Sequence, residues 1–379
     1  MAFRLGELFC GPGGLGWGAV HAAVAGREDL VIQHAWANDL DGQTCATYRY
    51  NLAPNDPESV IRADVHELDI ERDPRIQARP FDAFAFGFPC NDFSLVGEQK
   101  GFEGKYGPLY TYGIRVLKAY QPRWFLAENV SGLASANQGE AFRKILDDMQ
   151  AAGYRVYPHL YKFEEYSIPQ ARHRIIIIGI REDEQDQNGQ PLAFFPPAPT
   201  TPCPMQYKTC REALENPPVT PDLPNTEMPR MSERVKKRLA YIGPGENVFN
   251  ARNIQAHPEL QLKVRGAKIS QIYRRLDPTR PAYTVTGSGG GGTHIYHWSE
   301  PRALTNRERA RLQTFPDDFV FQGTRESVRK QIGMAVPCEG ARQIFEAVLK
   351  TFGGVPYAHV PCNIPLSAAG KNREEGTDA

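Results

Sequence analysis

The chain has 379 residues, of which 41% are hydrophobic and 23% charged, a composition ordinary for a soluble globular protein with two or three domain-sized units. Its 44 basic residues balance 44 acidic ones, so the totals do not indicate a nucleic-acid binder. No apolar run reaches the roughly 18 residues of a membrane span, and no signal peptide opens the chain. Seven cysteines without Cys-x-x-Cys spacing argue against a disulfide framework and a zinc site. We expect a cytoplasmic protein without metal.

Residues 4–185 alternate short apolar runs with amphipathic stretches, a pattern typical of βαβ units with a parallel sheet. The predicted strands are Leu5–Cys10, His34–Asn38, Phe81–Phe86, Trp124–Ala127 and Arg174–Ile180, and the predicted helices are Tyr110–Ala119 and Gln138–Ala151. Four consecutive isoleucines at 175–178 indicate a strand that is covered on both faces. The sequence therefore predicts an α/β fold with a doubly wound, mostly parallel sheet.

The second half of the chain has a different character. Residues 196–229 contain ten prolines, too many for a regular helix or a central strand. Residues 230–280 contain twelve Lys or Arg against four acidic residues, an excess that could face a phosphate backbone or form a solvated surface. Five glycines in Gly287–Gly292 could admit a ligand or form a flexible loop. Helical patterning returns at Thr305 and ends with an amphipathic helix over Gly340–Phe352.

A glycine-rich turn follows the first predicted strand. Gly11, Gly13 and Gly16 have the literal spacing of a dinucleotide fingerprint, and glycines there let backbone amides approach a ligand. Asp39 ends the second strand, where a carboxylate can hold ribose hydroxyls. Asp64 could accept a hydrogen bond from an adenine amino group. Each carboxylate alone could be a plain surface acid, but together with the turn they predict a nucleoside-containing cofactor.

Cys90 ends the apolar run that begins at Phe84, with Pro89 before it and polar residues after it. An α/β sheet usually binds its ligands at this edge, and a thiolate is a good nucleophile. The alternative is a buried structural thiol.

An acid and two arginines follow on later strands. Glu128 lies at the end of an apolar strand, where a carboxyl in a closed pocket can donate a proton. Arg172 and Arg174 are spaced to point to one side, which suits an anion, a carbonyl or a catalytic carboxylate. His173 between them is expected to be structural. A helix N-terminal acid remains the alternative for Glu128.

In this order the motifs resemble those of the cytosine-C5 DNA methyltransferases. The matching segments are Phe9-Cys-Gly-Pro-Gly-Gly14, Gly87-Phe-Pro-Cys90 with Phe93-Ser94, Glu128-Asn-Val130, Gln170-Ala-Arg172-His-Arg174, Arg302-Ala-Leu-Thr305 with Arg307-Glu-Arg-Ala-Arg-Leu-Gln-Thr-Phe-Pro316, and Gln331-Ile-Gly-Met-Ala-Val-Pro337. They cover essentially the whole chain except the proline-rich and basic module, where the family places its target recognition domain. Two residues depart from the family pattern: Asn91 stands where Gln is usual, and Met334 where Asn is common.

The resemblance implies a methyltransferase fold with S-adenosyl-L-methionine as cofactor and double-stranded DNA as substrate. It assigns catalysis to Cys90, Glu128, Arg172 and Arg174, with Arg172 on O2 of the base and Arg174 in support. The cofactor pocket is assigned to Phe9, Gly11, Gly13, Gly14, Asp39, Asp64, Pro89 and Leu109. The glycine-containing segment 95–107 has the composition of a lid over a flipped base.

The implied domains are a catalytic and cofactor-binding domain over 1–185, a smaller, irregular target recognition domain over 186–300, a C-terminal return over 301–360 and a disordered tail over 361–379. We expect a monomer of bacterial restriction-modification type that is paired with a restriction endonuclease. Two other readings stay open: a tRNA cytosine-C5 methyltransferase of the same architecture, and a catalytically inactive DNA-binding relative. The recognised DNA sequence does not follow from the chain.

Overall fold

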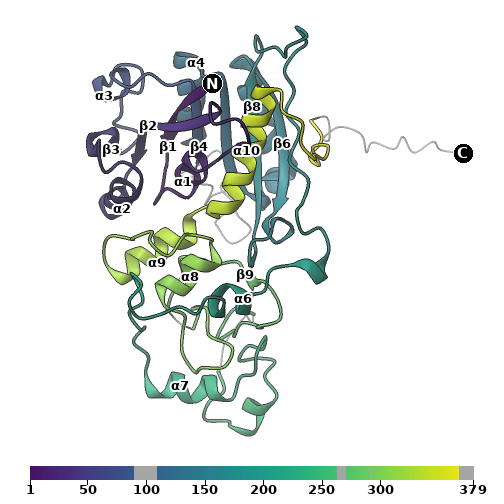
Figure 1. Ribbon diagram of the computed structural model, residues 1–379. Coiled ribbons are helices and arrows are strands. Elements are labelled where there is room, and N and C mark those ends of the chain that lie inside the picture. The colour runs from purple at the N-terminus through teal and green to yellow at the C-terminus, as the bar shows by residue number, and fades with distance from the viewer. Residues whose placement is uncertain (89–108, 263–269, 291, 367–379) are drawn as a thin grey trace, which may run out of the picture.

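The computed structural model describes residues 1–88, 109–262, 270–290 and 292–366, without the side chains of 135–138. A sheet flanked by helices occupies one end of the molecule, and a smaller part rich in loops occupies the other (Figure 1). We call residues 1–200 and 336–366 the sheet region, and residues 201–335 the small region.

A seven-stranded sheet forms the sheet region, with the strand order β3-β2-β1-β4-β5-β8-β6. The strands are β1 (Ala2–Leu8), β2 (Val31–Asp39), β3 (Val60–Arg62), β4 (Ala83–Gly87), β5 (Trp124–Val130), β6 (Tyr154–Lys162) and β8 (His173–Arg181). β1 to β5 are parallel, while β8 runs antiparallel to both β5 and β6. The predicted mostly parallel sheet is confirmed. The carboxyl ends of β1 to β5 meet at one edge, which faces the small region.

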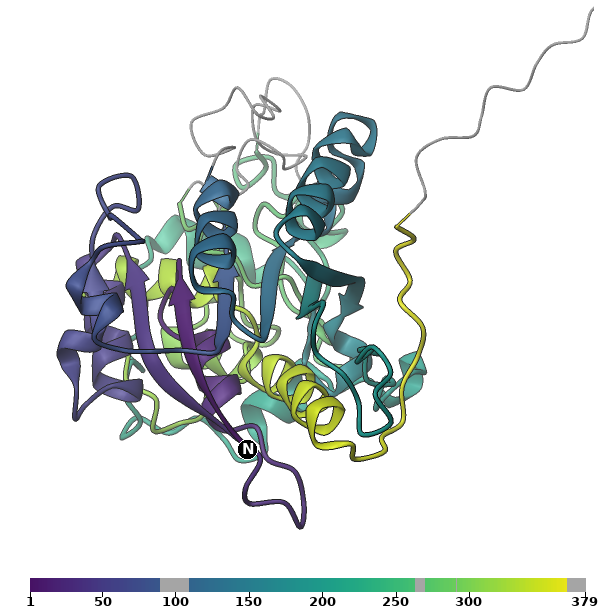
Figure 2. The same ribbon diagram turned by 90° about the horizontal axis from the view of Figure 1, so that it is seen from above.

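Helices cover both faces of this sheet (Figure 2). In chain order they are α1 (Gly14–Val20), α2 (Gly42–Leu52), α3 (Pro74–Gln77), α4 (Tyr110–Tyr120), α5 (Glu140–Ala151) and α10 (Cys338–Gly353), with short 3-10 turns η1 (Pro57–Ser59), η4 (Ser131–Gly139) and η5 (Phe163–Tyr166). One apolar layer joins α3, α4 and α5 to the sheet and contains Ile175 and Ile177. The opposite layer joins α1 and α10 and contains Ile176 and Ile178. The isoleucine run is therefore covered on both faces, as predicted.

The small region has little regular structure. Its elements are η6 (Pro204–Gln206), α6 (Cys210–Glu215), α7 (Glu233–Ala240), η7 (Asn253–Ala256), β9 (Ala282–Tyr283), α8 (Asn306–Leu312) and α9 (Arg325–Met334). β9 pairs with β7 (Gln170–Ala171), just before β8, and so joins the two regions.

The domain boundaries differ from the sequence-based ones for a physical reason, which is the grouping of the buried side chains. Leu192 and Phe194 pack into the sheet core, so residues 186–200 stay with the sheet region. One apolar cluster joins residues 210–214 and 276–298 with residues 304–338, so α8 and α9 belong to the small region and only α10 returns to the sheet.

The first residues of the expected tail, 361–366, are held in place and do not fit the predicted disorder. The Asn363 side chain accepts a hydrogen bond from the Leu160 amide at 2.7 Å, so residues 361–366 lie along β6, and the rest of the tail lies outside the described residues. The six cysteines in the described ranges form no disulfide bonds with one another. No helix among the described residues is long and apolar enough to cross a membrane.

Candidate active site

The glycine turn connects β1 to α1 at the carboxyl edge of the sheet. The Gly11 amide donates to Asp39 Oδ2 at 3.0 Å, so the turn is tied directly to the end of β2. Phe9 and Gly13 have positive φ angles of 55° and 102°. Glycine adopts such an angle readily, but in Phe9 it is unusual and needs support from the surroundings. Phe9 packs against the apolar layer that contains α4. The turn is thus fixed by its neighbours.

Gly14 packs against the segment between α9 and α10. A Cβ atom at this position would lie 2.4 Å from the Val336 carbonyl oxygen, far inside contact distance. The turn from the first twenty residues is therefore closed by the segment between α9 and α10. Within the turn, the Gly11 amide donates to Asp39 and the Gly13 amide donates to the Cys10 carbonyl, whereas Gly14 is the first residue of α1, where helix amides have no partner within the helix.

Asp39 and Asp64 lie at the ends of neighbouring strands. Asp39 Oδ1 accepts from the Asp41 amide at 3.0 Å, and burial raises the pKa of Asp39. Asp64 Oδ1 lies 2.7 Å from His66 Nδ1 and also accepts from the His66 amide. The buried Asn38 donates to the Ile61 carbonyl within β3 and to the Ala63 carbonyl directly after it, which ties the strand end that carries Asp39 to the chain that leads to Asp64.

Glu128 faces Arg174 at the end of β5. Arg174 Nε lies 2.9 Å from Glu128 Oε1, and the two side chains are 14% and 13% exposed. Glu128 is in register with Gly87, the last residue of β4. A Cβ on Gly87 would lie 3.2 Å from Glu128 Oε2, so the glycine leaves room for the carboxylate. The pair is partly open, and a substrate group could reach it.

The chain leading to Cys90 is anchored beside Glu128. Asn129 Nδ2 donates to the Phe88 carbonyl at 3.1 Å, which holds the residue after β4 against the end of β5. Cys90, Pro89 and the expected lid over 95–107 lie outside the described residues. Leu109 begins the chain again and is buried in the core, next to α4.

Arg172 is placed differently from the sequence-based expectation. It is 1% exposed, with Nη1 donating to the Val285 carbonyl at 3.1 Å and Nη2 to the Gly333 carbonyl at 3.2 Å. Burial lowers the pKa of Arg172 well below its ordinary value, and nearby Arg174 lowers it further. This geometry does not fit a contact between Arg172 and O2 of a base. Arg174 is the arginine beside Glu128 at the open edge.

His173 makes an ion-pair contact of 2.7 Å with Glu164, away from the site, in line with its expected structural role. Within the described ranges, no group of three or more His, Cys, Asp or Glu side chains could hold a metal ion.

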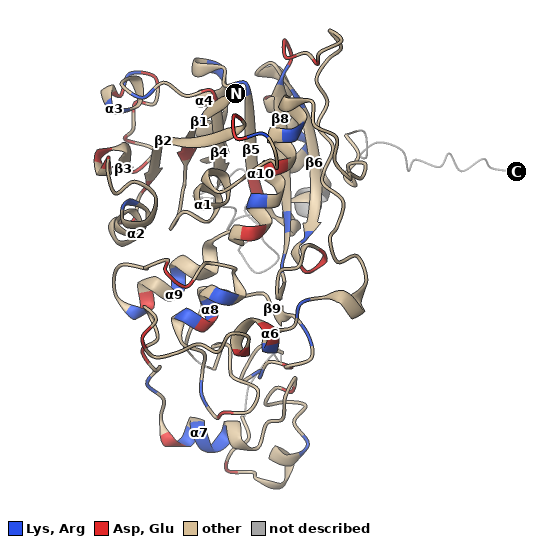
Figure 3. Cartoon of the chain, viewed as in Figure 1, with Lys and Arg blue, Asp and Glu red and all other residues tan. Residues whose placement is uncertain are grey.

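Part of the basic segment is structural. Of the twelve basic residues between 230 and 280, Arg238 and Arg275 are buried and donate to main-chain carbonyls, so they are not free to contact DNA. Other basic residues lie along α7, at the far end of the small region (Figure 3). The surface charge is therefore smaller than the sequence count suggested.

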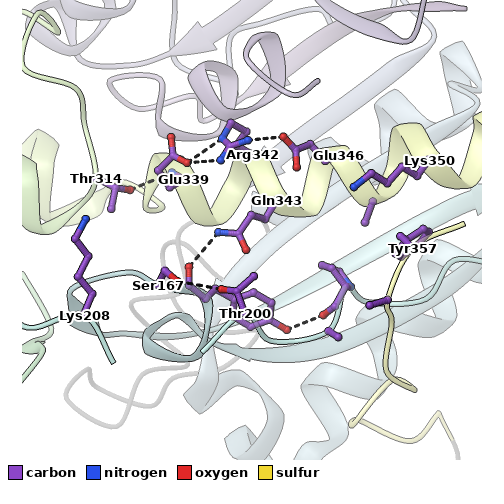
Figure 4. A pocket seen from close by; sticks show the side chains of 15 residues that line it. Ser167, Thr200, Lys208, Thr314, Glu339, Arg342, Gln343, Glu346, Lys350 and Tyr357 are labelled. Atoms are coloured by element: carbon purple, nitrogen blue, oxygen red, sulfur yellow. Dashed lines mark hydrogen bonds and ion pairs between the residues drawn. The ribbon is translucent and has the colours of Figure 1, made fainter. Parts of the chain in front are cut away.

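A pocket of about 680 Å³ lies on a different face, between α10, η5 and the chain after Pro197 (Figure 4). Arg342 is paired there with Glu339 and Glu346. None of the expected catalytic or cofactor residues is among its lining residues, so this hollow is separate from the sheet edge.

Comparison with solved structures identifies the class of fold. The Schizosaccharomyces pombe Dnmt2 methyltransferase aligns with a TM-score of 0.54 at 14% identity, over 94% of this chain and 100% of that one. The Entamoeba histolytica methyltransferase EhMeth aligns with a TM-score of 0.58 at 12% identity, over 93% and 98%. The sheet region thus has the fold of S-adenosylmethionine-dependent methyltransferases.

Sequence comparison then identifies the family. The model of the C-5 cytosine-specific DNA methylases matches residues 3–350. The Type II methyltransferase M.BbvI of Brevibacillus brevis is 54% identical over 366 residues, covering 95% of this chain and 94% of the relative. M.NgoFVII of Neisseria gonorrhoeae, also a Type II methyltransferase, is 37% identical over 351 residues, covering 91% and 86%. The chain belongs to the C-5 cytosine-specific DNA methylases and is a DNA (cytosine-5-)-methyltransferase.

In the sequence, Asn38 stood out only as the end of a predicted strand and Asn129 only as part of a motif, and neither residue was assigned a function. The structure shows both buried and holding main-chain carbonyls, one at each half of the sheet edge. An amide side chain directly beside a predicted site carboxylate was the available signal.

Proposed function

We propose that the enzyme adds the Cys90 thiolate to C6 of a cytosine that has been flipped out of duplex DNA, and that C5 then accepts a methyl group. Attack at C6 makes C5 nucleophilic, which the intact aromatic ring is not. Loss of the C5 proton and elimination of the thiolate release 5-methylcytosine. The observation that carries this proposal is the Glu128–Arg174 pair at the open edge of the sheet, beside the chain that leads to Cys90.

Glu128 can share a proton with N3 of the base and so neutralise charge that develops in the ring. Arg174, adjacent to it and partly exposed, is in a position to donate to O2, and we assign the O2 contact to Arg174. Arg172 is assigned a positioning role, because both of its terminal nitrogens are engaged with carbonyls. The target atoms are inaccessible in a duplex, so the base must leave the stack.

S-adenosyl-L-methionine fits the turn at Gly11 to Gly14 and supplies the methyl group when bound. The Gly14 amide at the start of α1 would bind its methionine end, and Gly11 and Gly13 would shape the turn around it. Phe9 would pack against adenine, and Asp39 would accept hydrogen bonds from the ribose hydroxyls. Asp64 would take the adenine amino group, with Pro89 and Leu109 as further lining. The raised pKa of Asp39 is compatible with this role because hydroxyl donors favour the ionised carboxylate.

The substrate we propose is double-stranded DNA with a specific site, read by the small region. The Type II names of the relatives support a restriction-modification role, in which methylation protects DNA from a paired endonuclease. We propose further that the enzyme acts as a cytoplasmic monomer. Sequencing 5-methylcytosine in DNA from expressing cells would give the site.

The decisive experiment follows the transfer of a labelled methyl group from S-adenosylmethionine to duplex DNA and to tRNA. We expect label in DNA, none in tRNA, and none with Cys90→Ala, while the variant still binds S-adenosylhomocysteine in calorimetry. Retained 5-methylcytosine formation by Cys90→Ala would contradict the nucleophile assignment, and label only in tRNA would contradict the substrate.

A further inference from the structure

Three long polar side chains are buried where the sheet region meets the small region. Gln170, Arg172 and Gln313 are each at most 1% exposed. Burying a polar group is unfavourable unless it is hydrogen-bonded, so their partners indicate what they do.

Gln170 joins β7 to two segments of the small region. Its Oε1 accepts from the Val285 amide at 2.7 Å, and its Nε2 donates to the Leu312 carbonyl at 3.0 Å. The same Nε2 donates to Gln313 Oε1 at 2.9 Å. The strand that leads into β8 is thereby fixed to the segment after β9 and to the end of α8.

Gln313 continues the connection to the end of α9. Its Nε2 donates to the Ile332 carbonyl at 2.7 Å and to the Ala335 carbonyl at 3.2 Å. Both amide groups of the Gln170–Gln313 pair are therefore satisfied. Paired amides of this kind fix the geometry of the segments that they join. Among the three buried side chains, only the Nε of Arg172 has no hydrogen-bond partner in the part of the chain that the structure describes.

Arg172 closes the connection into a ring. It donates to the carbonyls of Val285 and Gly333, and so links the same two segments as the glutamines. The segments also touch directly, because a Cβ on Gly333 would lie 2.0 Å from the Gly287 amide nitrogen. The ring therefore holds the segment after β9 in a fixed position against the end of α9.

The two sides of the ring lead to the two halves of the active site. On one side, Arg172 is two residues from Arg174, which contacts Glu128. On the other side, Ala335 precedes Val336, whose carbonyl lies against Gly14 of the glycine turn. A shift within the ring would move one half relative to the other.

We propose that Gln170 and Gln313 are positioning residues that align the base pocket with the methyl donor. This inference rests on the proposed Cys90 mechanism, and it separates two steps of that mechanism. Addition of the thiolate to C6 needs the base pocket alone, whereas methyl transfer also needs the donor in line with C5. A misplacement of about 1 Å can slow an oriented reaction by about a hundredfold.

The experiment compares the two steps on genomic DNA that carries tritium at cytosine C5, taken from cells without the enzyme. In the absence of donor, Cys90 adds to C6, C5 takes a proton from water, tritium leaves as the cation, and the thiolate departs, which releases tritium without net reaction. With donor present, methyl incorporation measures the complete reaction. We expect Gln313→Met and Gln170→Met to lower methyl transfer at least about tenfold and donor-free tritium release by less than about threefold.

The control is Gln331→Met. Gln331 is equally buried in α9, but it bonds Thr47, Gln322 and Ser327, outside the ring. We expect it to lose comparable stability and to keep the wild-type ratio of the two rates. If a methionine variant does not fold, Gln170→Asn and Gln313→Asn test the same ratio, because they keep the amide group and shorten the side chain by one carbon.

An unchanged ratio in the folded ring variants would overturn the positioning role alone. An equal change in Gln331→Met would do the same, because it would reflect general loss of structure. The absence of tritium release from the wild-type enzyme would instead contradict the Cys90 mechanism.

Discussion

The sheet region and the small region differ in how their buried main-chain groups obtain hydrogen-bond partners. In the sheet region, buried main-chain groups pair across seven strands. The small region has few such pairs, and buried arginines satisfy its carbonyls instead. Arg275 alone donates to the carbonyls of Leu239, Ile242, His297 and Glu300. An arginine has five N–H donors on a rigid plane, so one side chain can organise several turns of irregular chain.

Arg307 repeats this arrangement nearer the sheet, with bonds to the carbonyls of Pro224, Pro316 and Phe319. The comparison teaches that basic residues in a DNA-binding segment have two separate roles. Some shape the segment, and only the remaining ones can contact phosphate or bases. Three predictions test this contrast between the regions.

The largest effect is expected at Arg275. Arg275→Met would leave the Ile242 and His297 carbonyls without this donor. The Leu239 and Glu300 carbonyls would lose one of two donors, because they also accept from the amides of Ile242 and Arg302. We expect the variant to lower the free energy of unfolding by about 3 kcal/mol or more. Chemical unfolding should show the loss, while S-adenosylhomocysteine still binds the sheet region in calorimetry. The matched control is Arg274→Met, since Arg274 mainly stacks on Tyr283 with 4.7 Å between guanidinium carbon and ring centre. We expect about 1 kcal/mol or less there; equal losses would contradict the contrast.

The sheet region contains a buried titratable carboxyl group, and this group gives the second prediction. Glu7 is 1% exposed and accepts a hydrogen bond from Tyr48, and burial raises its pKa from 4.5 to about 7. Because the folded-state pKa is the higher one, the folded protein binds the extra proton, and stability falls as the pH rises from about 5 to above 7. The full change is on the order of 3 kcal/mol.

Thermal unfolding between pH 5 and 8.5 checks this dependence. Glu7→Gln keeps an acceptor for Tyr48 and removes the titration, so the stability of the wild type relative to the variant should fall as the pH rises from about 5 to above 7. Burial lowers the pKa of nearby His34 to about 4, so this group adds stability as the pH rises towards 6.5. Because His34 is present in both proteins, its contribution cancels in the difference between them. A parallel pH dependence in both proteins would contradict the assignment to Glu7.

The smallest effect is expected where Gly14 packs against Val336. Gly14→Ala would force the Val336 carbonyl away from the turn, and we expect about tenfold weaker S-adenosylhomocysteine binding in calorimetry. Gly26→Ala is the control, since a Cβ there meets open space and lies far from the turn in sequence, so only local backbone strain is added. Unchanged affinity in Gly14→Ala would show that the turn can shift freely.

The sequence predicted the sheet region well because its signals are local. The isoleucine run needs no partner to be recognised as a doubly covered strand, and the glycine turn follows its strand directly. We propose to exchange the roles that the resemblance implied for Arg172 and Arg174, because identical side chains two residues apart differ only in what lies opposite them. The carbonyls that meet Arg172 come from residues 113 and 161 positions further along the chain. No local pattern records such distant partners.

The contact between Gly14 and Val336 has a consequence for the order of synthesis. The turn leaves the ribosome long before the segment that closes it, because most of the sheet region and the small region lie between them in the chain. An unfinished chain therefore has strands and helices but an incomplete cofactor turn. Methylation by this enzyme should begin only when the chain has been made at least as far as Val336, and two fragments split anywhere between these residues should be inactive until they reassociate.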